Sequence, residues 1–460
     1  MKNSHTLTCS PMKFTLPIQS SLKVDIEITD NPYELEVEAL FDMAARINKK
    51  RAFLFVSKIL GKHLPIDPGT GLITGALLAD RYLETVKGIE SGRRDELLVS
   101  FMNGGKNFVN HPFINEHVNP VIIGFAETAT ALGHAFYQFF QKADFFHTTR
   151  EQVIEFDPVI TFEEEHSHAT SHRCYVEESI LNNNREIILV DDEITTGKTA
   201  INIIRSIHER FPRKSYTVVS ILDWRSEQNL RRYDDLKKEL GIIIHSVSLL
   251  KGKIHTSGTP DIFEKTITET EIPLANQAIS TIHIKELFPE KLTAIEYTSL
   301  SLDGQVKKIP YLKETGRFGV NSAANLKFDQ DMRVIGQYLA DRRTGRRSLV
   351  LGTAEFMFLP MKLASYMGDG VKYQSTTRSP IYVEKRDGYG AQYGLAFPNP
   401  DDREIAHFVY NIPPHEYDEL FLFFERAVSL DQLQPFLNEL KKTHINDIKV
   451  VFFNGGIQGE

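Results

Sequence analysis

Apolar and polar positions along the chain alternate in blocks that predict strands and helices in turn. Short apolar runs at 120–124, 144–147, 187–190 and 217–222 are predicted strands, and amphipathic patterns at 129–141 and 200–209 are predicted helices between them. Further helical patterns at 35–48 and 74–88 precede this unit. This alternation is typical of a parallel sheet covered by helices, with ligands at the carboxyl ends of the strands. The pattern therefore predicts an α/β fold.

Two adjacent acids, Asp191 and Asp192, follow the apolar run 187–190, and the turn after them ends in Thr-Thr-Gly-Lys-Thr at 195–199. Such a turn points backbone N–H groups and a helix N-terminus at its ligand, which favours a phosphate. The two carboxylates would repel a phosphate, but they can accept hydrogen bonds from two vicinal hydroxyls. A ribose 5-phosphate offers both groups. A Walker A loop needs a glycine five residues before Gly197, where Asp192 stands. The simpler alternative is an acidic strand end that caps a helix through Asp192 or Thr195.

Residues 187–199 resemble the phosphoribosyl pyrophosphate (PRPP) motif of type I phosphoribosyltransferases. The resemblance implies that the ribose hydroxyls are held by Asp191 and Asp192. It implies that the 5-phosphate is wrapped by Thr195, Thr196, Gly197, Lys198 and Thr199. It also implies Mg²⁺ as cofactor, bound through PRPP, with direct coordination by the two aspartates left open. The reaction it predicts is transfer of ribose 5-phosphate from PRPP to a nitrogenous base or similar acceptor.

The loop between the strand at 120–124 and the following helix contains Ala126, Glu127 and Thr128. In phosphoribosyltransferases the loop at this place holds the pyrophosphate through its backbone N–H groups. The small residues here allow a close approach, which the helix dipole supports. Glu127 departs from a simple anion loop, and we expect it to hold a magnesium-bound water or a substrate amine. A tight strand–helix turn without a ligand is the alternative.

Two segments of the chain repeat each other at a constant offset. Val-Ile-Ile-Gly-Phe-Ala-Glu at 121–127 is echoed by Leu-Val-Leu-Gly-Thr-Ala-Glu at 349–355, and a Thr-Thr-Arg triplet follows at 148–150 and at 376–378. The repeat predicts a second, degenerate α/β copy of the same unit. Its acidic strand end, 419–426, keeps Glu425 but loses the acid pair and the Gly/Thr turn. Ribose phosphate is therefore expected only in the first copy, and Glu355, Thr377 and Arg378 are the functional candidates of the second.

Thr-Thr-Arg-Ser-Pro at 376–380 and the Gly/Tyr-rich stretch 386–390, taken with the first copy, resemble an orphan phosphoribosyltransferase family fused to a TRSP domain. That family occurs beside bacterial tellurium-resistance and stress genes. The resemblance implies a type I phosphoribosyltransferase-like parallel sheet flanked by helices, in a phosphoribosyltransferase domain at 1–285. A linker at 286–320 and a TRSP domain at 321–460 follow. It implies biosynthesis of a nucleoside-like metabolite and leaves the acceptor undefined. A homo-oligomer or stress-operon partners stay open. The hood over the acceptor is expected from the N-terminal region or from Arg386 and Tyr389.

Residues 162–173 are rich in histidine and lie where related enzymes carry a lid. Arg173 and His168 are expected to act in catalysis from this lid, with His166 and His172 beside them. A metal site is the sharper alternative, because His-x-His-x3-His-x-Cys ends at Cys174. A solvated loop is the third. An early turn with Lys62 and His63 is not assigned to the site.

Composition narrows the class of protein. The chain has 460 residues, enough for two or three domains, and its net charge of −8 argues against a nucleic-acid-binding surface. Two cysteines indicate a reducing compartment, and no membrane segment or signal peptide is recognised, so a cytoplasmic location is expected. Two other functions stay open: a PRPP-binding regulatory protein, and a scaffold of two copies without transferase turnover.

Overall fold

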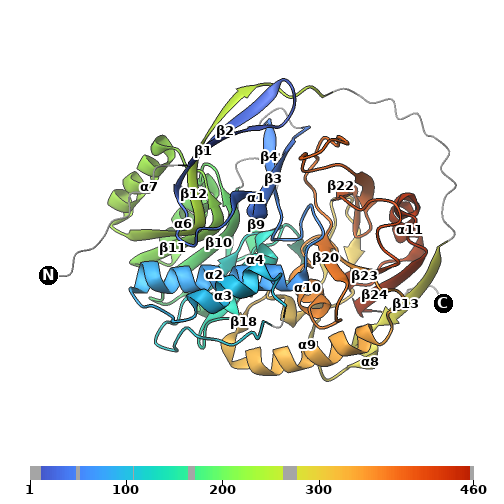
Figure 1. The fold of residues 1–460 in the computed structure, drawn as a ribbon. Coiled ribbons are helices and arrows are strands. Elements are labelled where there is room, and N and C mark those ends of the chain that lie inside the picture. The colour runs from blue at the N-terminus through green and yellow to red at the C-terminus, as the bar shows by residue number, and fades with distance from the viewer. Residues whose placement is uncertain (1–11, 48–51, 107, 164–170, 263–276, 456–460) are drawn as a thin grey trace.

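The computed structural model describes residues 12–47, 52–106, 108–163, 171–262 and 277–455. Two sheets dominate it (Figure 1). In the first, β12, β11, β10, β5 and β6 are parallel neighbours, while β2 and β18 run antiparallel to them at the two sides and β1 pairs with β2. In sheet order the strands are β1 (Met12–Pro17), β2 (Leu22–Asp30), β12 (Ile243–Gly258), β11 (Ser215–Asp223), β10 (Ile187–Ile194), β5 (Val121–Gly124), β6 (Asp144–His147) and β18 (Val320–Asn321).

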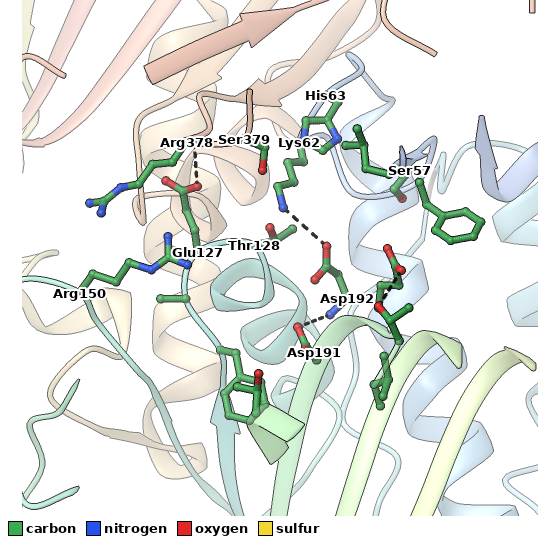
Figure 2. Close-up of a pocket in the computed structure, with 18 of the residues that line it drawn as sticks. Ser57, Lys62, His63, Glu127, Thr128, Arg150, Asp191, Asp192, Arg378 and Ser379 are labelled. Atoms are coloured by element: carbon green, nitrogen blue, oxygen red, sulfur yellow. Dashed lines mark hydrogen bonds and ion pairs between the residues drawn. The ribbon is translucent and has the colours of Figure 1, made fainter. Parts of the chain in front are cut away.

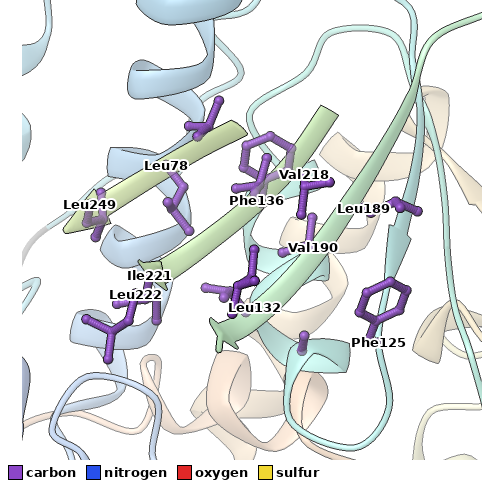
Figure 3. Packing of buried hydrophobic residues seen from close by; sticks show 14 of the residues in the cluster. Leu78, Phe125, Leu132, Phe136, Leu189, Val190, Val218, Ile221, Leu222 and Leu249 are labelled. Atoms are coloured by element: carbon purple, nitrogen blue, oxygen red, sulfur yellow. The ribbon is translucent and has the colours of Figure 1, made fainter. Parts of the chain in front are cut away.

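The helices of the first sheet follow the predicted order. They are α2 (Pro68–Lys87), α3 (Arg94–Met102), α4 (Ala129–Tyr137), α5 (Glu178–Leu181), α6 (Lys198–Arg210) and α7 (Glu227–Leu240). The four strand predictions and the three helices near 74–88, 129–141 and 200–209 are confirmed, although α2 already begins at Pro68 and α4 ends at Tyr137. Leu132 and Phe136 of α4 pack with Leu78 of α2 against Val190 and Val218 of the sheet (Figure 3). This packing places α4 and α2 against the face of the sheet.

The helix predicted at 35–48 is wrong. Only one turn, α1 (Val37–Leu40), is helical, and it is followed by β3 (Phe41–Ala45) paired antiparallel with β4 (Phe53–Ser57). The run Met43-Ala44-Ala45 has good helix propensity, but extended pairing buries it completely. Phe55 of β4 stacks on Trp224 with ring centroids 5.0 Å apart. Tertiary packing therefore outweighs the local preference in this hairpin.

The second sheet is entirely parallel, in the order β13 (Ala278–His283), β24 (Asp447–Asn454), β23 (Glu419–Arg426), β19 (Ser348–Gly352) and β20 (Val371–Ser375). Its helices are α8 (Ile284–Leu287), α9 (Asn325–Ala340), α10 (Phe358–Ala364) and α11 (Leu430–Leu440). The order β24-β23-β19-β20 corresponds to β11-β10-β5-β6 of the first sheet. The second sheet thus repeats the central arrangement of the first.

Smaller strands complete the fold around these sheets. They are β7 (Gln152–Val153) with β15 (Ser299–Leu300) and β16 (Val306–Lys307), β8 (Ile160–Glu163) with β9 (Ser171–Cys174), β14 (Ala294–Ile295) with β17 (Tyr311–Leu312), and β21 (Gly394–Asn399) with β22 (Asp402–Tyr410). Short 3-10 helices lie at Lys313–Thr315, Ser322–Ala324 and Lys441–Thr443. No helix among the residues that the structure describes is long and apolar enough to cross a membrane.

The two Thr-Thr-Arg triplets occupy equivalent local structures. Thr148 Oγ1 accepts a hydrogen bond from the amide of Ala126 at 2.9 Å, and Thr376 Oγ1 accepts one from Ala354 at the same distance. Each triplet then pairs with a hairpin, Thr149 with Arg173 and Thr377 with Phe408. The repeat seen in the sequence therefore coincides with a repeat of backbone contacts.

The two halves of the chain exchange segments. β18, which precedes α9, pairs with β6 at the edge of the first sheet, and Ile66, which precedes α2, bridges Tyr373 of β20 at the edge of the second. β13 lies in the second sheet although it comes before the predicted domain boundary at residue 285. One buried cluster joins Ile66 and Ala131 to residues of the second half. The halves consequently share a core, and pockets can form between them.

Candidate functional site

A cavity of about 540 Å³, here called the first pocket, opens at the carboxyl ends of β5 and β10 (Figure 2). Both halves of the chain line it. The first half provides the two acids, most of the turn after them, the loop after β5 and part of the N-terminal hairpin. The second half provides residues 378–380 and 404–406. These residues include Arg46, Leu54, Phe55, Ser57, Lys62, His63, Ala126, Glu127, Thr128, Arg150, Asp191, Asp192, Thr195, Thr196, Gly197, Thr199, Arg378 and Ser379.

Strand β10 includes the acid pair, so the backbone of Asp191 and Asp192 is extended near the carboxyl end of the strand. Asp191 Oδ1 accepts a hydrogen bond from the amide of Asp192 at 2.9 Å. Both residues are only partly buried, unlike the preceding strand residues, which are fully buried. The parallel strands thus hold two carboxylates at a fixed place while leaving them open to a ligand.

The turn after the acids brings the N-terminus of α6 to the pocket. Gly197 is the N-cap with a φ of 73°, a conformation that side chains disfavour, and it provides no side-chain cap. A Cβ at this position would lie 2.4 Å from Tyr233 Oη, which donates a hydrogen bond to the Gly197 carbonyl at 2.9 Å. Glycine is therefore required by both backbone and space. Lys198, which the sequence included in the phosphate loop, is not among the described lining residues, whereas Thr195, Thr196 and Thr199 are.

The loop after β5 places Glu127 deep in the pocket, at 8% exposure, and the peptide bond between Ala126 and Glu127 is cis. Glu127 Oε2 accepts a hydrogen bond from the amide of Arg378 at 3.2 Å. Burial by itself would raise the pKa of Glu127, but the nearby His407, Arg378, Arg150 and Lys62 act together to lower it. Glu127 Oε1 is buried without a partner among the described residues. Glu127 is therefore a carboxylate that joins the two halves and keeps one oxygen for a ligand.

Arg150 and Arg378 end the two Thr-Thr-Arg triplets and flank Glu127 from opposite sides (Figure 2). Glu355 of the second half makes the equivalent contact with the first half: it binds the amide of Arg150, as Glu127 binds the amide of Arg378. Glu355 accepts hydrogen bonds from Thr149 Oγ1 at 2.6 Å and from the amide of Arg150 at 2.9 Å. Glu355 and Thr377 are both buried. Of the three second-copy candidates, only Arg378 lines the first pocket.

The structure describes only part of the predicted lid. His166 and His168 lie outside the described residues. His172 is buried on β9, with Nδ1 2.8 Å from Thr148 Oγ1 and its ring stacked on Phe162. Arg173 donates to the carbonyl of Arg150 at 2.9 Å and lines a different cavity. Arg173 therefore does not line the cavity that holds the acid pair.

The alternative metal site receives no support from the residues whose placement is known. Among them, no group of three or more His, Cys, Asp and Glu side chains could hold a metal ion. Cys174 is buried, and burial raises the pKa of its thiol. A thiol in this state is a poor metal ligand, because metals bind the thiolate.

Several lining residues were not assigned from the sequence. Lys62 Nζ lies 3.8 Å from Asp192 Oδ2, and beside it His63 is buried, which lowers the pKa of its imidazole well below the ordinary value. Leu54 and Phe55 of β4 form an apolar wall. The turn around Lys62 gave a weak signal in the sequence. The hairpin gave none, because it was predicted to be helical.

The strand end equivalent to the acid pair looks different in the second half. Glu425 of β23 is 2.7 Å from Arg317, whose side chain is 1% exposed and also lies 3.3 Å from Glu355 and 3.4 Å from Glu151. The helix that follows, α11, is closed by a capping box in which Ser429 Oγ accepts from the amide of Gln432, and Gln432 Oε1 from that of Ser429. This strand end is filled by the protein itself.

Comparison with known families divides the chain in two. Residues 40–253 match a family model described as a phosphoribosyl transferase, and residues 314–440 match a model described as the TRSP domain C-terminal to it. The chain therefore carries a phosphoribosyltransferase domain followed by a TRSP domain, as the resemblance implied. No curated protein was found to match the chain.

Solved structures give weak likenesses only. The adenine phosphoribosyltransferase of Trypanosoma brucei, in complex with AMP, pyrophosphate and ribose-5-phosphate, is 14% identical over 48% of this chain and 80% of that chain, with a TM-score of 0.29. The adenine enzyme of Rhodothermus marinus is 16% identical over 29% and 70%, with a TM-score of 0.20. The orotate enzyme of Aeropyrum pernix is 14% identical over 28% and 59%, with a TM-score of 0.17. Scores this low identify no substrate, so the two family models carry the assignment.

Proposed function

We propose that the first pocket binds PRPP with Mg²⁺ and transfers its ribose 5-phosphate to a nitrogenous acceptor. One observation carries the proposal: within a phosphoribosyltransferase domain, a carboxylate pair and a glycine turn open into the same cavity at the end of β10. The pair suits a ribose diol, and the turn suits a phosphate. Each requirement is met by backbone geometry as well as by residue type.

The first pocket has groups of suitable charge for each part of PRPP: the ribose, the 5-phosphate and the pyrophosphate. Carboxylate oxygens of Asp191 and Asp192 accept hydrogen bonds from the ribose hydroxyls, and the residues of the 195–199 turn that line the cavity hold the 5-phosphate. Across the cavity, Arg150 and Arg378 provide positive charge for the pyrophosphate beside the 126–128 loop. PRPP spans the pocket in this arrangement, with C1 of the ribose between the acids and the arginines.

The residues fit a magnesium ion bound mainly by its substrate. Mg²⁺ usually takes one or two carboxylates, substrate phosphates and several waters. Asp191, Asp192 and Glu127 line the cavity and would hold the ion, and Glu127 Oε1 has no hydrogen-bond partner among the described residues. When bound, the ion neutralises charge on the leaving oxygens.

In the reaction, the C1–oxygen bond breaks and its electron pair leaves with pyrophosphate, while a nitrogen of the acceptor forms the new bond to C1 and loses its proton to the departing pyrophosphate. Positive charge develops on the ribose ring, and the fixed carboxylates of Asp191 and Asp192 stabilise it. Arg150 and Arg378 stabilise the negative charge that collects on the pyrophosphate. The lowered pKa of Glu127 keeps it charged, so it orients an acceptor N–H or a metal-bound water.

The acceptor lies against the N-terminal hairpin. Leu54 and Phe55 line the same cavity as the acid pair, and the ring of Phe55 stacks on Trp224. Tyr389 of the second half accepts a hydrogen bond from the amide of Ala45 at 2.9 Å and so fixes the hairpin. The hood therefore comes from the N-terminal region, and the second half supports it. A flat heterocyclic base suits an aromatic wall of this kind.

The second half is proposed to be a degenerate copy that completes the first pocket without binding ribose phosphate itself. The same strand order, the same triplet contacts and the reciprocal glutamates support a common origin. Its contribution to the reaction is Arg378. Removal of the TRSP domain would therefore remove part of the transferase site.

The test is a calorimetric titration of the full chain with PRPP and Mg²⁺. We expect Asp191→Asn/Asp192→Asn to weaken binding at least about 100-fold, because each carboxylate loses a charged hydrogen bond. A matched control is Asp234→Asn/Asp235→Asn, an adjacent pair exposed on α7, which should bind like the wild type. Absence of binding by folded wild type would overturn the proposal.

Turnover is measured separately, as pyrophosphate release with a panel of nitrogenous bases. Release that depends on one base would establish the transferase and identify its acceptor class. Tight PRPP binding with no release from any base would favour the alternative, a PRPP-binding regulatory protein.

A further inference from the structure

A second cavity, of about 400 Å³, lies beside the first pocket. We call it the second pocket. The two share four lining residues, Arg150, Leu302, Arg378 and Ile405. The second pocket is also lined by Arg426 at the end of β23 and by Ser429 at the start of α11. The second pocket therefore lies at the junction between a strand and the following helix of the second sheet, as the first pocket does in the first sheet.

The interior contacts of the second pocket exclude a ribose phosphate. At its strand end, Glu425 is bound by buried Arg317 and by the amide of Leu312 at 3.0 Å, so it is not available to a diol. The amide of Gln432 in the first turn of α11 is bound by Ser429, so this turn does not present it to a phosphate. A ligand in this pocket must be recognised by side chains.

The acids of the second pocket are engaged by the protein. Glu151 pairs with Arg426 at 2.7 Å, and Arg426 and Arg317 hold the pKa of Glu151 at about 2 against the effect of burial. Glu355 is bound by Thr149 and Arg150, and Asp401 pairs with Lys307. Asp402 accepts the amide of Leu302 at 2.8 Å. These bonds neutralise or satisfy every acid that lines the pocket.

Three cations of the second pocket have no such partner. Among the described residues, no carboxylate lies within 4.0 Å of the charged groups of Arg173, Lys308 or Arg378. They come from three separate segments: β9, the strand pair β15–β16 with its continuation, and the Thr-Thr-Arg turn of the second half. Three convergent positive charges in a cavity with its acids already paired create a positive potential.

We propose that the second pocket binds a compact polyanion, of the phosphate or pyrophosphate class and without a ribose diol. Arg173 and Lys308 contact it from one side, and Arg378 from the wall shared with the first pocket. Because Arg378 faces both cavities, an anion here competes for the charge that would hold an anion in the first pocket. The proposal rests on the geometry of the second pocket and does not require transferase activity.

The probe is inorganic pyrophosphate, titrated calorimetrically into the full chain without Mg²⁺ at low salt. The test variant is Lys308→Glu, an exposed residue that lines only the second pocket. We expect it to weaken one class of pyrophosphate sites at least about tenfold, since a charge is reversed beside the anion. Lys142→Glu, exposed and outside both pockets, is the matched control and should leave all binding unchanged.

A parallel titration with ribose 5-phosphate separates this proposal from the transferase. Ribose 5-phosphate should bind the wild type and Lys308→Glu equally. Pyrophosphate binding that is equal in wild type, Lys308→Glu and Lys142→Glu would overturn the second pocket and leave the transferase untouched. Lys308-sensitive pyrophosphate binding without any ribose 5-phosphate binding would support the second pocket and contradict the transferase instead. An equal loss in Lys142→Glu would show a general charge effect and would also overturn the second pocket.

Discussion

The junctions β10–α6 and β23–α11 occupy the same place in two parallel sheets, and only one of them is open. At β10–α6, the acids are partly exposed and a glycine begins the helix without a side-chain cap. At β23–α11, the acid is held by a buried arginine and the helix is closed by a capping box. The difference teaches that a strand end in an α/β sheet opens into a cavity only where its acids stay partly exposed and are not enclosed by a buried cation.

The two junctions also differ in the cation beside the acid, which is Lys62 at the first and Arg317 at the second. Lys62 is 3.8 Å from Asp192, with side-chain exposures of 18% and 27%, so the pair can open for a ligand. Arg317 is 1% exposed and lies within 3.4 Å of three carboxylates. Burial of an arginine at such a junction is tolerated because carboxylates lie beside its guanidinium. Lys62 thus lines an open cavity, whereas Arg317 is part of the core.

The largest expected effect is on Arg317. Arg317→Met leaves Glu425, Glu355 and Glu151 without their shared partner, and we expect the free energy of unfolding to fall by about 3 to 5 kcal/mol. Lys62→Met is the control and should lower it by less than about 1 kcal/mol, because that pair is partly solvated. Urea denaturation of both variants measures the two values. Equal losses would contradict the distinction between a closed and an open junction.

An intermediate effect is expected at Gly197. Gly197→Ala places a Cβ against Tyr233 at a positive φ, so the turn must shift, and we expect PRPP to bind about tenfold more weakly. Gly241→Ala tests the backbone cost alone, since Gly241 has a φ of 63° and nothing within 4 Å of its Cβ. It should lower stability and leave PRPP affinity unchanged. The calorimetric assay of the acid pair serves here, and unchanged affinity of Gly197→Ala would mean that the turn does not hold the phosphate.

The smallest effect is expected at the closed junction. Ser429→Ala removes the cap of α11 and should cost about 1 kcal/mol of unfolding free energy, with PRPP affinity unchanged. Ser226→Ala removes the cap of α7, where Ser226 accepts from the amide of Asn229 at 3.3 Å, and should behave alike. Thermal denaturation with calorimetry checks both quantities. A loss of PRPP affinity in Ser429→Ala alone would place α11 in the binding site.

The central strands and the acid-turn motif were predictable because their signals are local. Asp191, Asp192 and Gly197 are adjacent in the chain, and a buried strand followed by a small-residue turn permits few other structures. The internal repeat was visible for a different reason, namely that its two copies are separated by a constant offset. The hairpin at 41–57 was not predictable, because its strands depend on Trp224 and Tyr389, which are distant in sequence.

By itself, the sequence determined the α/β alternation, the acid pair, the phosphate-type turn and the loss of that motif in the repeat. Only the tertiary structure decided which charges meet. In the structure, Arg378 contacts Glu127 and Lys62 contacts Asp192, whereas Arg173 lines a different cavity from the acids. The reason is physical: backbone pairing depends on patterns that neighbouring residues carry, whereas the fate of a charge depends on which distant segment packs against it.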